Sequence, residues 1–212
     1  MTESLYPPFV VKVCGIRSED EARAAVAAGA NALGFNFYRR SPRYIAPEVA
    51  QQIVCHLPDA VLKVGVFVEP SAMEIEEMLA HVSLDVVQLH GAHAPTVPCR
   101  TWRALVAEKA NPAESLAAEA ILLDAHTPHF GGSGKTFDWK IATRFWQPLI
   151  LAGGLDAANV AEAMELVRPW GVDACSKLES APGRKDTGKV KSFVKAALSA
   201  SHYFRSISVA QQ

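Results

Sequence analysis

Eight short apolar runs, spread along almost the whole chain, constrain the fold more than any other feature of the sequence. Each run is rich in β-branched or aromatic residues and has the length of a strand. The runs begin near Phe9, Ala32, Leu62, Val86, Thr101, Ala120, Leu149 and Gly171. Their mean spacing is about 23 residues, which is enough for one strand and one crossover helix.

Helical spacing of apolar residues occupies several of the intervals between these runs. The predicted helices are Glu19 to Ala28, Pro47 to His56, Ser71 to His81, Ala157 to Val167 and Lys189 to Ala200. Ser18 with Glu21, and Ser71 with Glu74, match the capping box that begins many helices. Eight strand-helix units predict an α/β fold, a single eight-stranded parallel β/α (TIM) barrel. A doubly wound open sheet is the alternative, but no Gly-x-Gly-x-x-Gly sequence supports it.

Length and charge narrow the range of functions. We expect one barrel domain over residues 1–200, with a polar tail over 201–212. A formal net charge of -1 and the lack of a Lys/Arg block argue against a nucleic-acid partner. The chain has no signal-peptide pattern and no run of eighteen apolar residues. Its four cysteines are scattered, so we expect a reduced, cytoplasmic protein, a monomer or homodimer that binds a small molecule.

Two of the apolar runs end on groups that can exchange protons, Cys14 and Asp124. Strand parity places Lys12 on the same face as Cys14, toward the barrel interior, where an ammonium would favour the thiolate. Burial of Asp124 would raise the pKa of its carboxyl, so that it can act as a general acid. The alternatives are a buried cysteine that only fills space and an aspartate that caps a helix or orders a loop.

Further polar groups follow the fourth and sixth runs. Gln88 and His90 share a face, and either can orient a substrate, although a structural histidine is an equal alternative. The segment from Gly131 to Thr136 is similar to part of a nucleotide phosphate loop, but His129 stands where the first glycine belongs. We therefore interpret this segment, with Gly132, as a loop that closes over a ligand. His126 and His129 lack a third ligand nearby in sequence, so no metal is expected.

The last two runs are followed by residues that suit an anion. Gly153 and Gly154 come after the seventh run, and Asp173 and Ser176 come at the end of the eighth. Barrel enzymes often bind phosphate at these two strand ends, where glycines let backbone N–H groups approach closely. A tight strand-to-helix turn is the alternative for the glycines. We interpret the four residues as a phosphate site.

Nine motifs, taken in order, cover nearly the whole chain. They are Lys12-Val-Cys-Gly-Ile16, Leu33-Gly-Phe-Asn-Phe-Tyr38, Ser41-Pro-Arg-Tyr44, Val64-Gly-Val-Phe-Val68, Val87-Gln-Leu-His-Gly91, Leu122-Leu-Asp124, Gly131-Gly-Ser-Gly-Lys-Thr-Phe-Asp-Trp139, Leu151-Ala-Gly-Gly-Leu155 and Glu179-Ser-Ala-Pro-Gly183. Together they resemble the phosphoribosylanthranilate isomerase family. The resemblance implies a TIM barrel and an Amadori rearrangement in tryptophan biosynthesis. That reaction turns N-(5-phosphoribosyl)anthranilate into an aminoketose phosphate and needs no cofactor.

The resemblance also implies roles for individual residues. Cys14 would be the general base that removes the C2′ proton, and Asp124 the general acid that protonates the furanose ring oxygen. Arg43 would pair with the anthranilate carboxylate. One segment departs from the family, because Cys175 replaces a serine and Lys177 replaces a glycine. Two interpretations of Lys177 are open: added charge at the phosphate site, or a side chain that points into solvent.

Two competing functions are considered beside this one. The related sugar isomerase of histidine biosynthesis uses two carboxylates, whereas this chain has Cys14 at the first strand end and Arg43 in a family motif. The other alternative is a non-catalytic barrel that binds a phosphorylated ligand, for which the altered segment around Lys177 is the only support. Fold class does not choose between them, because barrels host many reactions.

Overall fold

Eight parallel strands close into one barrel in the computed structural model, which describes residues 9–112, 118–125 and 136–210 and side chains as far as Ser201. The strands are β1 (Val10–Cys14), β2 (Ala32–Asn36), β3 (Leu62–Val68), β4 (Val86–His90), β5 (Arg100–Val106), β6 (Ala120–Asp124), β7 (Leu149–Leu151) and β8 (Gly171–Ala174). β1 pairs with β2 on one side and with β8 on the other. The predicted barrel is confirmed, and the open sheet is excluded.

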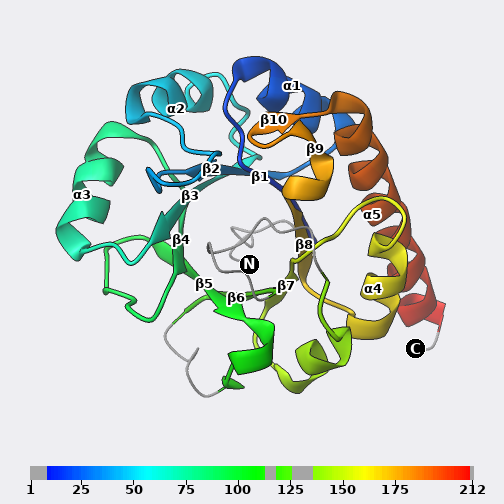
Figure 1. Cartoon of the computed structure of the whole chain (residues 1–212). Helices are drawn as coiled ribbons and strands as arrows, with labels where there is room; N and C mark the ends of the chain where they lie inside the picture. The colour runs from blue at the N-terminus through cyan, green and yellow to red at the C-terminus, as the bar shows by residue number, and fades with distance from the viewer. Residues whose placement is uncertain (1–8, 113–117, 126–135, 211–212) are drawn as a thin grey trace.

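Helices surround this ring of strands (Figure 1). The α-helices are α1 (Glu19–Ala28), α2 (Pro47–Val54), α3 (Ala72–His81), α4 (Val160–Val167) and α5 (Thr187–Ala210). Ser71 and Glu74 form the predicted capping box of α3. Ser18 accepts from the Glu21 backbone N–H of α1, but the Glu21 carboxylate accepts from the Arg17 and Lys185 N–H groups instead. Only half of the capping box predicted at Ser18 and Glu21 is therefore present.

Among the described residues between β4 and β7, no α-helix is present. No helix lies between β4 and β5 in residues 91–99, which contain Gly91, Pro95 and Pro98. The 3-10 helix η1 (Ala107–Lys109) follows β5, and η3 (Trp139–Arg144) precedes β7. These are the intervals in which the sequence shows no clear helical period.

Strand alternation divides the core into two layers. Val11 and Val13 face the helices in the outer layer. The inner layer fills the barrel and contains Val10, Ala32, Leu62, Val64, Val86, Trp102, Ala104, Ala120, Leu122, Ile150 and Ala152. Lys12 shares this inward face of β1 and is fully buried, which confirms the predicted parity.

A hairpin that the sequence does not predict follows β8. After the 3-10 helix η4 (Ser176–Leu178), β9 (Glu179–Ala181) pairs with β10 (Arg184–Lys185). Gly183 turns the hairpin with φ of 78°, and a side chain there would collide with the carbonyl of Pro42. The hairpin therefore packs closely against the segment between β2 and α2.

Helix α5 continues past the boundary predicted at residue 200 and ends at Ala210. Neither glycine nor proline occurs between Lys189 and Ala210, so the backbone chemistry provides no stop near residue 200. Residues 201–210 extend the last barrel helix, and the expected division between domain and tail falls inside it. Among the described residues, no helix is both long and apolar enough to cross a membrane.

Candidate active site

The carboxyl-terminal ends of the strands surround a cavity of about 90 Å³. It is lined by Cys14, Asn36, Tyr38, Ser41, Pro42, Arg43, Val66, Val68, Gln88, His90, Leu122, Asp124, Asp173 and Cys175. The thiol and the carboxyl singled out in the sequence therefore meet, although 110 positions separate Cys14 from Asp124. Such a cavity at this end of a β/α barrel is where catalytic groups gather.

Lys12 places a permanent positive charge beside Cys14. Its Nζ donates a hydrogen bond of 2.9 Å to Asp173 Oδ1, which joins β1 to β8. Burial alone would lower the pKa of Lys12, but the charges of Asp173 and Cys14 and the hydrogen bonds to them raise it above its ordinary value. Lys12 is thus cationic at neutral pH. Removing Asp173 would leave this buried charge without its carboxylate partner, at a cost of about 3–5 kcal/mol.

Cys14 occupies the end of β1 and is 8% exposed. It pairs in register with Gly34 of β2, where an added Cβ would lie only 2.7 Å from Cys14 Sγ, so glycine makes room for the thiol. A hydrogen bond from Cys175 has the largest effect on Cys14 and lowers its pKa below the ordinary thiol value. The charges of Lys12 and Lys185 act in the same direction, whereas burial opposes them. Cys14 therefore ionises more readily than a free cysteine, as a base requires.

The pKa of Asp124 is shifted in the opposite direction, upward. Burial, followed by the charge of Asp173, raises the pKa of Asp124 to about 7, against a hydrogen bond of 2.8 Å from the Ala125 N–H. A carboxyl with this pKa keeps much of its proton at neutral pH and can donate it. The burial of Asp124 and its raised pKa agree with the expectation from its place at the end of β6.

Gln88 and His90 lie together on the cavity wall. Gln88 Nε2 donates to His90 Nε2 at 2.8 Å, so the ring proton of a neutral His90 is on Nδ1. Burial, then the charges of Lys12 and Arg103, lower the pKa of His90 to about 3, which keeps the ring neutral. Within the described part of the chain, Gln88 Oε1 is buried and has no hydrogen-bond partner. This oxygen is available to a donor on a ligand in the cavity.

A smaller cavity of about 30 Å³ contains the predicted phosphate residues. Gly153, Gly154, Ser176 and Asp173 line it, and the exposed Lys177 lies at its rim. Gly153 and Gly154 have φ of 84° and 63°, in the left-handed region that favours glycine. A Cβ on Gly153 would lie 2.8 Å from the Ala125 backbone nitrogen, so only glycine allows this approach of the two strand ends. Gly132, His126 and His129 are outside the described residues.

Arg43 lines the cavity around Cys14, but one edge of its guanidinium is already hydrogen-bonded. Nε and Nη2 donate to the two carboxylate oxygens of Glu179, at 2.8 and 2.9 Å. Lys185 Nζ donates to Glu179 Oε1 at 3.0 Å and to Cys175 Sγ at 3.6 Å. Sequence reasoning assigned no role to Glu179, Lys185 or Cys175 in this network. Glu179 begins a family motif, which was the only available signal for it.

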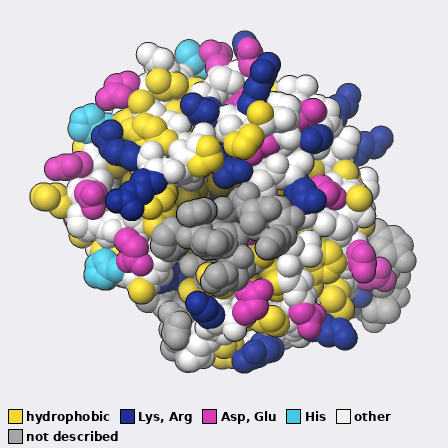
Figure 2. Space-filling model, in the orientation of Figure 1, with side chains coloured by type: hydrophobic (Ala, Val, Ile, Leu, Met, Phe, Trp, Pro, Cys, Tyr) yellow, Lys and Arg dark blue, Asp and Glu magenta, His cyan; other side chains and the backbone are white. Residues whose placement is uncertain are grey.

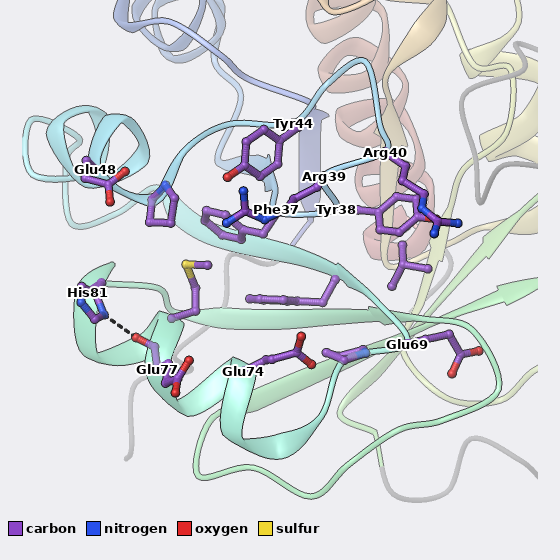
Figure 3. Close-up of a pocket in the computed structure, with 15 residues that line it drawn as sticks. Phe37, Tyr38, Arg39, Arg40, Tyr44, Glu48, Glu69, Glu74, Glu77 and His81 are labelled. Carbon is purple, nitrogen blue, oxygen red and sulfur yellow. Dashed lines mark hydrogen bonds between the residues drawn. The ribbon is translucent and has the colours of Figure 1, made fainter.

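A third cavity, of about 570 Å³, is larger but contains different chemistry (Figure 3). It lies between α2 and α3, with Glu48 on one side and Glu77 and His81 on the other. Phe37 and Phe67 also line it. Tyr38 and Val68 line both this cavity and the one around Cys14. The third cavity contains neither Cys14 nor Asp124. Over the face in Figure 2, basic and acidic side chains are interspersed.

A closed β/α barrel with a thiol and a carboxyl of opposite pKa tendency in one cavity belongs to the class of barrel enzymes that work by acid–base catalysis. Comparison with known proteins gives the family. The sequence model of N-(5'phosphoribosyl)anthranilate (PRA) isomerase matches residues 11–196. N-(5'-phosphoribosyl)anthranilate isomerase of Solibacter usitatus is 45% identical over 199 residues, covering 91% of this chain and 98% of that protein.

Solved structures agree with the sequence comparison. Phosphoribosyl anthranilate isomerase from Thermotoga maritima has a TM-score of 0.80 and 39% identity, covering 90% of this chain and 99% of the other. A phosphoribosyl anthranilate isomerase in complex with reduced 1-(o-carboxyphenylamino)-1-deoxyribulose 5-phosphate has a TM-score of 0.75 and 35% identity over the same shares. The chain belongs to the phosphoribosylanthranilate isomerase family, and it is an isomerase of tryptophan biosynthesis. The two competing functions are not supported.

Proposed function

We propose that Cys14 and Asp124 divide the proton transfers of the isomerase between them. The enzyme catalyses the Amadori rearrangement of N-(5-phosphoribosyl)anthranilate to 1-(2-carboxyphenylamino)-1-deoxyribulose 5-phosphate. Asp124 donates its proton to the furanose ring oxygen, and the bond from that oxygen to C1′ breaks to give a Schiff base. Cys14 then removes the proton from C2′. The resulting enolamine tautomerises to the ketone.

The observation that carries this proposal is the opposite tendency of the two groups in one cavity. The pKa of Asp124 is raised to about 7, and the pKa of Cys14 is lowered. At neutral pH the carboxyl is therefore poised to give a proton while the thiol is poised to take one. Pairs of titratable groups whose environments separate their pKa values in this way commonly act as the acid and base of one reaction.

Arg43 and Gln88 are suited to hold the two halves of the substrate in the cavity around Cys14 and Asp124. Glu179 fixes the Nε edge of Arg43, and within the described residues Nη1 makes no hydrogen bond. This remaining nitrogen is free to donate to the anthranilate carboxylate, and a guanidinium of fixed orientation is well matched to a carboxylate. The buried Gln88 Oε1 can accept from a ribose hydroxyl.

The phosphate is assigned to the smaller cavity, with Gly153, Gly154, Asp173 and Ser176 at its wall. The hydroxyl of Ser176 and backbone N–H groups would donate to the phosphate, and Lys177 at the rim would add charge. Gly132 remains a residue predicted from sequence to cover the ligand. Lys12 is fully buried, and its ammonium interacts with Asp173 and Cys14 inside the barrel.

Replacing Ser176 by alanine should raise KM about 10- to 100-fold, because one hydrogen bond to a charged group is lost. The value of kcat should change by less than about threefold, since phosphate binding is the same in ground state and transition state. Steady-state kinetics of both variants, with exposed Ser180→Ala as the matched control, measures this split. A Ser176→Ala enzyme with unchanged KM would remove the residue from the phosphate site.

The activity itself is tested by mixing the purified protein with freshly generated phosphoribosylanthranilate and following the loss of anthranilate fluorescence. Saturable turnover by the wild-type chain is expected. If turnover is absent although the substrate binds, the chain is a binding protein and the proposal fails.

We further propose that the enzyme acts in the cytoplasm as a monomer or homodimer. The support comes from a relative: one similar crystal structure is that of monomers of a dimeric phosphoribosylanthranilate isomerase from Thermotoga maritima. Light scattering on the purified protein distinguishes the two states.

A further inference from the structure

Cys175 stands out because it lines the cavity around Cys14 although the proposed mechanism does not use it. Register brings it to Cys14: Val13 pairs with Ala174 across β1 and β8, so the next residue on each strand is Cys14 and Cys175. The register and the shared cavity place the Cys175 thiol beside the Cys14 sulfur, and the pKa values of the two thiols are shifted in opposite directions, as a hydrogen bond donated by Cys175 would shift them. Both cysteines line the cavity that contains Asp124.

The other side of Cys175 is also occupied. Lys185 Nζ donates to the Cys175 backbone oxygen at 3.2 Å and to its sulfur at 3.6 Å. The same Nζ donates to Glu179 Oε1 at 3.0 Å, which anchors the ammonium on the hairpin. Cys175 thus receives a hydrogen bond from a fixed cation, and this bond would strengthen a hydrogen bond that the Cys175 thiol donates in turn.

We propose that Cys175 is a positioning residue for the isomerase reaction: its thiol donates a hydrogen bond to the Cys14 sulfur, holding it ionised and directed into the cavity. The inference rests on the proposed role of Cys14 as the base. A serine at this position would supply a hydroxyl donor in the same place, whereas alanine would supply none.

Several charged and titratable groups surround the pair, and among them Lys12, Lys185 and Asp173 shift the pKa of Cys14. The surrounding groups are Lys12 on β1, Arg43 after β2, His90 on β4, Asp124 on β6, Asp173 on β8, Glu179 on β9 and Lys185 on β10. The hydrogen bond from Cys175 is the largest influence that lowers the pKa of Cys14, and the pKa of Cys175 is raised well above its usual value. Cys175 therefore keeps its proton over the pH range in which Cys14 first ionises, and it can donate a hydrogen bond there.

The test compares Cys175→Ala and Cys175→Ser with wild type in two measurements. The first is the rate at which iodoacetamide alkylates Cys14 as a function of pH, quantified on the Cys14 peptide by mass spectrometry. The second is the acidic limb of the profile of kcat/KM against pH. In Cys175→Ala both midpoints should move upward by about one to two pH units, because a hydrogen bond to the charged form is lost. In Cys175→Ser they should return most of the way to wild type. The control is Cys99→Ala, a half-buried thiol at the start of β5, which should leave both midpoints unchanged.

The outcomes separate this inference from the function on which it rests. Unchanged midpoints in Cys175→Ala would overturn the role of Cys175, whatever the activity of the Cys14 variants. Full turnover in Cys14→Ser would instead overturn the proposed base, while the alkylation profile would still report on the hydrogen bond. If alanine at 175 prevents folding, the serine variant still decides: midpoints displaced as far as by a lost donor would contradict the proposal.

Discussion

Replacing Cys14 by serine is expected to lower kcat by about 10²- to 10⁴-fold, the usual contribution of a positioned general base. A hydroxyl has a much higher pKa than a thiol, and the hydrogen bonds and charges that favour the Cys14 thiolate cannot ionise a serine at neutral pH. The side chain hardly changes in volume, so the fold and the binding of substrate should survive. Fluorescence-monitored turnover, together with circular dichroism, measures both.

The matched control for this variant is Cys55→Ser, because Cys55 is exposed and lies outside the cavity. It should keep the wild-type rate. If Cys14→Ser turned over substrate at a rate close to that of Cys55→Ser, the proton at C2′ would have to be removed by another group.

The second large effect is expected from Asp124→Asn, which should also lower kcat by about 10²- to 10⁴-fold. An amide accepts the same hydrogen bond from Ala125 but cannot give a proton to the ring oxygen. Because the acid must be protonated, the rate of the wild-type enzyme should fall as pH rises through the Asp124 pKa of about 7. Because the base must be ionised, it should also fall as pH drops through the Cys14 pKa, which gives a bell-shaped profile.

In Asp124→Asn the residual activity should lose the alkaline limb of this profile and keep the acidic limb. Asp59→Asn changes an exposed carboxylate and should leave both limbs in place. An alkaline limb that persisted in Asp124→Asn would assign the acid to a different group.

Much of the barrel can be predicted from the sequence, because the strands are short apolar runs and because α1 and α3 begin at the recognisable N-caps Ser18 and Ser71. The strand starts agree within one residue at Phe9, where β1 starts at Val10, and at Thr101, where β5 starts at Arg100. The end of α5 was missed because the polar residues after Ser201 suggest a tail, yet they contain no helix-breaking residue. The β9–β10 hairpin was missed because its strands are too short to show a period.

For the site, the sequence predicts groups on strand ends better than it predicts their partners. Cys14, Asp124 and the inward face of Lys12 follow from strand parity, a local property. The bonds of Arg43 to Glu179 span 136 positions, and nothing local announces them. Arg43 was expected to pair with the anthranilate carboxylate, and the structure shows that one edge of its guanidinium is bound to Glu179. Long-range ion pairs of this kind depend on the closure of the barrel, which brings distant parts of the chain together.

That closure bears on when the enzyme becomes active during its synthesis. Lys12 precedes Asp173 by 161 positions in the chain and is therefore synthesised well before it. The two residues form the buried ion pair that joins β1 to β8. A nascent chain that has emerged only as far as β7 has an ammonium inside the future barrel without its carboxylate, and such an unpaired charge opposes burial. Cys14 likewise has to wait for Cys175 and Lys185. The first strand carries Cys14, the proposed base, but we expect that this base can work only after the last hairpin has been translated.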